Sequence, residues 1–154
     1  MQILATVQDP EIPVVSVVDL GMIRDVRVSE EHVEIDVSPT YSGCPALDVI
    51  PILIREALHN AGIHNVTIRN VISPPWTTDW ISAEGKRKHM EYGIAPPVEQ
   101  STDASFLNHT EKSVPCPFCQ STNTRLVSQF GSTPCKAAYQ CSDCLEPFDY
   151  FKCH

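Results

Sequence analysis

Valine and isoleucine residues alternate with polar ones within two neighbouring stretches, residues 21–28 and 32–38, at Val26 and Val28 and at Val33, Ile35 and Val37. A period of two is typical of strands with one buried face. Ser29, Glu30 and Glu31 lie between the two stretches and suit a tight turn. This part of the chain therefore predicts a β-hairpin.

A helical period follows in residues 45–61. Apolar residues recur there at spacings of three and four: Leu47, Ile50, Ile54, Leu58 and Ala61. This pattern predicts a helix with one buried face, and Gly62 is a natural stop for it. Pro51 conflicts with a helix interior because it has no N–H to donate. Either the helix kinks at Pro51 or its regular part starts late.

The remaining pattern predicts a small α/β (α+β) domain with a three-stranded sheet and packed helices. The third strand is expected within residues 64–72, and a polar helix within residues 82–92 has Ser82 as a candidate N-cap. We assign the first domain to residues 1–95. Residues 96–114 lose both periods and predict a linker, and residues 115–154 form a second, cysteine-rich module.

The formal net charge is −8 and the sequence pI is about 5.1. Such a chain is repelled by a phosphate backbone at long range, so we expect no nucleic-acid partner. We also expect no membrane partner, because no apolar run approaches the roughly 20 residues that span a bilayer. The first ten residues do not have the pattern of a secretory signal. The sequence thus predicts a cytoplasmic protein.

Six of the seven cysteines lie in the last 39 residues, and four of these form two C-x-x-C pairs. The pairs are Cys116/Cys119 and Cys141/Cys144, with 21 residues between them. Two such pairs are the signature of a structural zinc site, because each tight turn aims two thiolates at one point. Iron remains an alternative metal, since the same four thiolates serve both. Redox dithiols without a metal are the other alternative.

Three further residues near the C-terminus could also bind a metal: Cys135, Cys153 and His154. They are either two thiols and a histidine without a ligand role, or a second, labile metal or cluster site. The sequence does not decide between these hypotheses. The histidines elsewhere, at positions 32, 59, 64, 89 and 109, have no ligand spacing and are expected at the surface.

Cys44 lies between the predicted hairpin and the predicted helix, directly before Pro45. Proline suits the first position of a helix, which makes Cys44 the expected N-cap. The helix dipole and the unpaired N–H groups there favour a thiolate, which can attack, bind a soft metal or accept sulfur. The alternative is a small buried apolar residue.

Several other residues are functional candidates by their surroundings. Thr40 lies in the segment before Cys44, and Asp9 and Glu11 place two carboxylates beside two rigid prolines. Trp76 and Asp79 lie in a segment with two tryptophans and one carboxylate. A capped turn is the alternative for the first carboxylate pair, and a core-anchoring turn for the tryptophan segment.

Three motifs resemble the iron–sulfur cluster assembly family that includes SufT: Asp9-Pro-Glu-Ile-Pro13, Asp19-Leu-Gly21 and Ser42-Gly-Cys-Pro45. Further motifs resemble more closely the PaaD family of the phenylacetyl-CoA epoxidase system, as does the fused ribbon. They are Trp76-Thr-Thr-Asp-Trp-Ile81, Tyr92-Gly-Ile-Ala-Pro-Pro97, Phe130-Gly-Ser-Thr133 and Glu146-Pro-Phe148. The match extends over nearly the whole chain.

The resemblance implies an accessory protein rather than an enzyme. Such a protein would help an iron–sulfur cluster or iron reach the reductase or oxygenase components of the epoxidase, with Cys44 as the functional residue and Asp9 and Glu11 as its neighbours. A transient iron–sulfur cluster or iron would then accompany one structural zinc ion. The alternative is a structural or electron-transfer subunit of the oxygenase complex. A homo-oligomer is compatible with either hypothesis.

Overall fold

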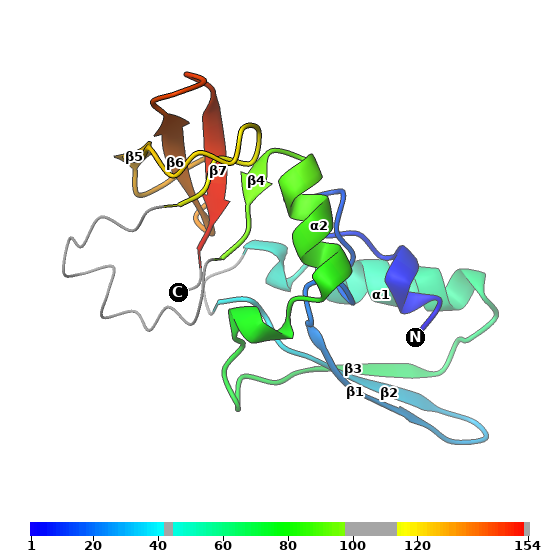
Figure 1. The fold of residues 1–154 in the computed structure, drawn as a ribbon. Helices are drawn as coiled ribbons and strands as arrows, with labels where there is room; N and C mark the ends of the chain where they lie inside the picture. The colour runs from blue at the N-terminus through cyan, green and yellow to red at the C-terminus, as the bar shows by residue number, and fades with distance from the viewer. Residues whose placement is uncertain (42–44, 98–113, 153–154) are drawn as a thin grey trace. The chain divides into compact units, whose positions relative to one another are not determined.

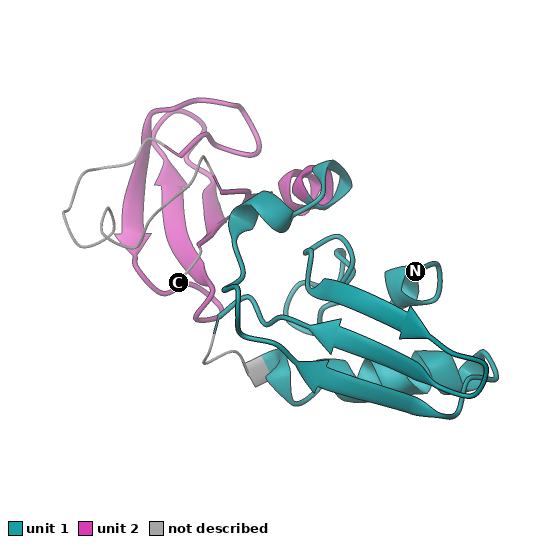
Figure 2. Cartoon of the chain, turned by 90° about the horizontal axis from the view of Figure 1, so that it is seen from below, with its two compact units in different colours: residues 1–85 teal, residues 86–154 magenta. Residues whose placement is uncertain are grey.

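A computed structural model describes residues 1–41, 45–97 and 114–152 (Figure 1). The chain forms two compact units, residues 1–85 and residues 86–154 (Figure 2). Each unit has its own sheet. No helix in the described part of the chain combines the length and the apolar character that a membrane crossing needs.

The first unit is built on a three-stranded sheet in the order β1-β2-β3. A short 3-10 helix, η1 (Leu4–Thr6), precedes the sheet. β1 (Ile23–Val28) and β2 (Val33–Val37) are antiparallel, and β3 (Val66–Asn70) is parallel to β2. The amide of Ser29 donates to the carbonyl of His32 at 2.8 Å and closes the predicted hairpin. All three strands were predicted from the period-two pattern.

The crossover between β2 and β3 contains the predicted helix, but its start differs from the sequence pattern. A 3-10 turn, η2 (Pro45–Leu47), comes first, and α1 (Ile50–Asn60) follows. Pro51 therefore lies in the first helical turn, where its missing N–H breaks no helical hydrogen bond. The regular part thus starts late, without a kink. Ile50, Ile54 and Leu58 are buried, whereas Ala61 is exposed.

The polar face of the sheet carries an interlaced set of ion pairs. Arg27 and Arg69 lie between Glu34 and Asp36 on the central strand, with N–O distances of 2.8–3.0 Å. Asp25 also pairs with Arg27. The hydrogen bond from Arg69 is the largest cause that lowers the pKa of Asp36, and the one from Arg27 lowers the pKa of Glu34. These cross-strand pairs hold the three strands in register.

The turn at residues 19–21 makes a close backbone contact with the segment that contains both tryptophans. Gly21 has φ +65°, and a Cβ built on it would lie 2.2 Å from the carbonyl oxygen of Trp80. The buried Trp76 donates its indole N–H to the carbonyl of Leu20 at 2.8 Å. The short helix η3 (Thr78–Trp80) completes this segment. Only glycine fits at position 21 without movement of the neighbouring backbone.

Asp19 connects the same turn to the start of α2 (Ala83–Glu91). Its carboxylate accepts hydrogen bonds from the amide and hydroxyl of Ser16, both at 2.9 Å. The Asp19 carbonyl accepts the amide of Ser82 at 2.8 Å. Ser82 in turn accepts the amide of Gly85 at 2.9 Å, which confirms its predicted role as the N-cap.

The second unit holds a four-stranded sheet in the order β4-β7-β6-β5. Its strands are β4 (Ile94–Ala95), β5 (Thr124–Ser128), β6 (Lys136–Cys141) and β7 (Pro147–Phe151). β4 pairs with β7 in parallel, so Ile94 and Ala95 belong to this sheet, although the sequence pattern grouped them with the first domain. Ala95 and Val114 lie in one buried cluster with Tyr139, Phe148 and Tyr150.

His89 is fully buried, so its expected surface position is wrong. Its ring lies 5.2 Å from the ring of Phe151, measured between centroids. Gly85 and His89 are both buried, one turn apart on α2, but neither has an apolar side chain, so no hydrophobic period marks this face. His59 and His64 are exposed as expected, and their rings are 4.2 Å apart.

Candidate metal centre and the surrounding sites

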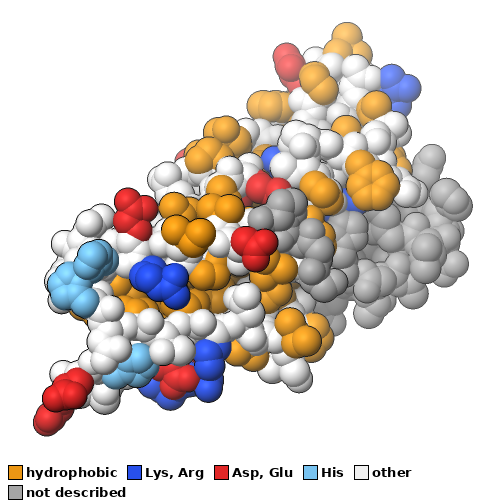
Figure 3. Space-filling view, turned by 180° about the vertical axis from the view of Figure 1, so that it is seen from behind, with side chains coloured by type: hydrophobic (Ala, Val, Ile, Leu, Met, Phe, Trp, Pro, Cys, Tyr) orange, Lys and Arg blue, Asp and Glu red, His pale blue; other side chains and the backbone are white. Residues whose placement is uncertain are grey.

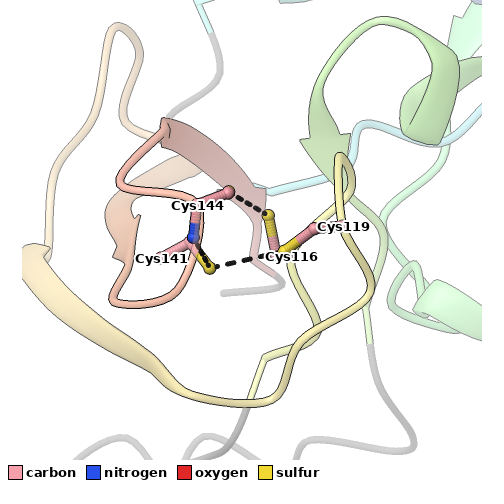
Figure 4. Close-up of side chains that lie close together, drawn as sticks. All are labelled: Cys116, Cys119, Cys141 and Cys144. Atoms are coloured by element: carbon pink, nitrogen blue, oxygen red, sulfur yellow. Dashed lines mark hydrogen bonds between the residues drawn. The ribbon is translucent and has the colours of Figure 1, made fainter.

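The four cysteines of the two C-x-x-C pairs converge on one point. The Sγ atoms of Cys116, Cys119, Cys141 and Cys144 all lie within 4.8 Å of one another (Figure 4). The closest approaches are 3.7 Å between Cys116 and Cys144 and 3.6 Å between Cys119 and Cys141. Four sulfurs about 2.3 Å from a tetrahedral ion are about 3.8 Å apart. The cluster therefore has the donor set and the spacing to hold one metal ion.

Each cysteine pair lies on the same kind of turn. The amide of the first cysteine donates to the carbonyl five residues later, at 2.9 Å for Cys116 and 3.0 Å for Cys141. The residue after the second cysteine has a positive φ, 63° at Gln120 and 66° at Leu145. The amide of Cys144 also lies 3.5 Å from the Sγ of Cys141. These turns point the thiols inward without any help from glycine.

A carboxylate that the sequence interpretation missed connects the two turns. The Asp143 carboxylate accepts a hydrogen bond from the hydroxyl of Ser121. It accepts a second one, at 2.8 Å, from the side-chain amide Nδ2 of Asn123. The bond from Ser121 is the main cause that lowers the pKa of Asp143. The sequence did contain a sign of this role, because Asp143 lies between Cys141 and Cys144 and therefore belongs to the same turn as these two candidate ligands.

The thiols of the second pair differ in how readily they lose a proton. The amide of Cys144 donates to Cys141 and lowers the pKa of Cys141 to about 7. A bond from the Glu146 amide favours the Cys144 thiolate, but burial and the neighbouring thiols outweigh it and raise the pKa of Cys144 to about 12. Crowded thiols cannot all ionise without a cation between them. A bound metal ion would supply that charge and displace the protons.

Cys135 lies apart from this cluster, in the turn before β6. It is buried, and its Sγ lies 3.0 Å from the hydroxyl of Thr133. Nearby, Lys152 donates from Nζ to the carbonyl of Gln129 at 2.5 Å, and burial lowers the pKa of this lysine. Cys153 and His154 are outside the described residues. The second metal site therefore stays a prediction.

The two carboxylates near the N-terminus have different surroundings. Asp9 is buried and accepts the amides of Glu11 and Ile12 at 2.8 and 2.9 Å, which is the capped turn considered above. Glu11 is half-buried, and Thr40 is buried. Cys44 is outside the described residues, so its closeness to Asp9 and Glu11 stays a prediction.

The tryptophan segment combines an anchor with an exposed side. Trp76 is buried and holds the turn at Leu20. Asp79 is exposed, whereas the ring of Trp80 is half-buried under the guanidinium of Arg24 at 3.3 Å. Trp76 therefore anchors the turn, whereas Asp79 and Trp80 form the more exposed side of this segment.

Two family models match the two parts of this chain, one over the domain with the three-stranded sheet and one over the cysteine-rich module. Residues 1–68 match the family described as "Iron-sulfur cluster assembly protein", and residues 100–152 match the "PaaD zinc beta ribbon domain". A protein of Escherichia coli K12, named as one of the subunits of 1,2-phenylacetyl-CoA epoxidase, is 46% identical over 151 residues. The match covers 98% of this chain and 89% of that protein. The chain belongs to the PaaD family.

Other relatives match the first unit. An "Fe-S protein maturation auxiliary factor" of Porphyromonas gingivalis is 37% identical over 86 residues, covering 54% of this chain and 81% of that protein. A crystal structure of a DUF59 domain from Bacillus anthracis has a TM-score of 0.53 and 28% identity, covering 56% of this chain and 83% of that chain. These comparisons confirm the predicted fold class and the family resemblance.

Proposed function

We propose that this protein is a maturation factor of the phenylacetyl-CoA epoxidase system. It would help an iron–sulfur cluster or iron reach a reductase or oxygenase component, without being an enzyme itself. The observation that carries the proposal is the near full-length similarity to the E. coli epoxidase protein, combined with the assembly-family match over residues 1–68. The similarity to the P. gingivalis maturation factor supports it for the first unit.

In this proposal Cys44 carries the transferred cluster or iron. The support comes from the sequence, since Pro45 follows directly and begins the 3-10 turn before α1. α1 itself begins at Ile50 with Val49 as its N-cap, so the end of this helix does not support a lowered pKa of the Cys44 thiol. The proposal rests on a soft, nucleophilic thiol in the segment between β2 and η2. Asp9 and Glu11 are its proposed neighbours, and Thr40, Asp79 and Trp76 are secondary candidates.

The proposed metal in the ribbon is zinc, bound for structural reasons. The site offers four sulfur donors from the protein, which suits a closed site without an open ligand position. The turns that present the thiols meet at one end of a small sheet. A unit of this size gains much of its folding free energy from the bound ion.

A second function has one specific observation in its favour. The E. coli relative is named as a subunit of the epoxidase, which fits a structural or electron-transfer component as well as a maturation factor. A subunit remains in the purified complex in a fixed ratio. A maturation factor leaves after its client has been loaded.

The test replaces Cys44 with serine in a strain that lacks its own copy and depends on the epoxidase for growth on phenylacetate. Serine is nearly the same size as cysteine, so the Cys44→Ser protein should fold normally. We expect client components with reduced iron or sulfide and no growth, whereas the wild-type gene in the same strain should restore both. Normal growth with fully loaded client would reject the carrier role. Stoichiometric co-purification with the complex would favour the subunit alternative.

A further inference from the structure

A groove in the first unit lies between the Asp9 turn and α1. Its volume is about 520 Å³. Residues 6–10 and Pro13 form one wall, and the outward side of α1 from Leu53 to Asn60 forms the other. The two prolines of the turn fix their backbone angles, so this wall is already formed before anything binds.

The groove offers several acceptors of hydrogen bonds. Two carboxylates, Asp9 and Glu56, line it together with the side-chain amides of Gln8 and Asn60, whose oxygens accept and whose NH2 groups donate. None of the described lining residues is basic. Within the part of the chain that the structure describes, no hydrogen bond or ion pair engages the side chains of Glu56, Gln8 or Asn60. These three groups are therefore available to a ligand.

The charge of the whole unit favours a cationic ligand. Residues 1–85 contain twelve Asp and Glu against four Arg and no Lys, so this unit accounts for the net charge of −8. Arg27 and Arg69 are already paired on the sheet, and Arg24 stacks on Trp80. The fourth arginine, Arg55, is exposed on α1 beside Glu56. Figure 3 shows acidic and basic side chains among hydrophobic ones on the face opposite to the view of Figure 1. An excess of negative charge attracts basic partners and speeds their association.

We propose that this groove binds an arginine side chain on an extended segment of a partner protein. The apolar wall of Val7, Pro10, Leu53 and Ala57 fits the methylene stem of such a side chain. Its guanidinium offers five donors in one plane, which suits several acceptors around one opening better than a lysine ammonium does. The proposal concerns a docking site and goes beyond the metal chemistry proposed above, on which it does not depend.

The test is a titration of the ¹⁵N-labelled full chain with acetyl-Gly-Leu-Arg-Leu-Gly-amide, followed by NMR at physiological salt. We expect saturable shifts at the amides of Gln8, Asp9 and residues 53–60. Glu56→Gln should weaken binding about fivefold, the effect of one exposed ion pair. Glu30→Gln, which removes an exposed acid in the β1–β2 turn, should leave the affinity unchanged. Glutamine is a good helix former, so the Glu56 variant should fold.

Two peptide controls make the result decisive. The citrulline analogue keeps the shape of arginine without its charge and should bind about fivefold more weakly. If the citrulline peptide binds as tightly as the arginine peptide, the charge does not contribute to binding and the proposal is wrong. If the lysine peptide binds as tightly as the arginine peptide, the preference for arginine is wrong. Shifts spread over the acidic surface, an equal effect of Glu30→Gln, or no saturation at millimolar peptide would each overturn the proposal.

Discussion

Replacement of Gly21 by alanine tests the contact between the turn at residues 19–21 and the tryptophan segment. The new Cβ would lie 2.2 Å from the Trp80 carbonyl oxygen and 2.6 Å from the Trp80 Cβ. Both atoms belong to a segment that Trp76 and Ser82 fix by hydrogen bonds. The segment cannot move away without breaking those bonds.

The expected cost has two parts. A non-glycine residue at φ +65° costs about 1–2 kcal/mol. Overpacking against the Trp80 backbone adds about 1–3 kcal/mol. Gly21→Ala should therefore lose about 2–5 kcal/mol, a large share of the roughly 5–15 kcal/mol that stabilise a domain. Gly62→Ala is the matched control, because Gly62 has φ +83° but no atom within 4 Å of its built Cβ. It should lose only about 1–2 kcal/mol.

Urea unfolding followed by tryptophan fluorescence measures both variants in the same unit. The chain has two tryptophans, and both lie in residues 1–85, so the signal reports on this unit alone. We expect the midpoint of Gly21→Ala to lie clearly below that of Gly62→Ala, with similar slopes. Equal midpoints for the two variants would show that the backbone contact costs nothing and would refute the reasoning.

Three further outcomes are expected. Metal analysis of the purified protein should give about one equivalent of zinc, and less than about half an equivalent of any metal would contradict the structural site. Removal of the zinc by a chelator should unfold the ribbon but leave the tryptophan fluorescence of the first unit unchanged. Cys135→Ser should keep the zinc. Because the hydrogen bond from Arg69 lowers the pKa of Asp36, this carboxylate stabilises the fold above its unfolded pKa of about 3.9 and loses that contribution as the pH falls further. The stability difference between wild type and Asp36→Asn should thus shrink below about pH 4 in urea titrations, and a constant difference would argue against the ion pair. Trp76→Phe leaves a buried carbonyl without its donor and should lose about 1–3 kcal/mol, more than Trp80→Phe, as measured by calorimetry.

The period-two and period-3.6 patterns were sufficient for the three strands and for α1 of the first unit, but not for its short 3-10 helices. Val33, Ile35 and Val37 predicted β2, and Ile50, Ile54 and Leu58 predicted the buried face of α1. Pro51 left the helix start open, because a proline fits both a kink and a first turn. The structure decides this through the 3-10 turn before α1.

The C-terminal ligands were predictable because two C-x-x-C pairs carry their geometry in their spacing. Asp143 was missed, since its contribution depends on the other turn, 20 residues away from it along the chain at Asn123. His89 was misplaced because one buried polar side chain produces no pattern. The groove beside Glu56 was also invisible, because its two walls meet only in the folded chain.

Ala95 and Val114 lie in one buried cluster, so the chain leaves and re-enters the same core on either side of residues 98–113. Both anchors belong to the second unit, so an insertion between them acts on the stability of that unit. The entropy cost of joining two fixed points through a flexible chain grows only with the logarithm of its length, by about 0.6 kcal/mol for each doubling. A peptide tag inserted between Ala95 and Val114 would lower the stability of the second unit slightly and would leave the covalent connection between the two units unchanged.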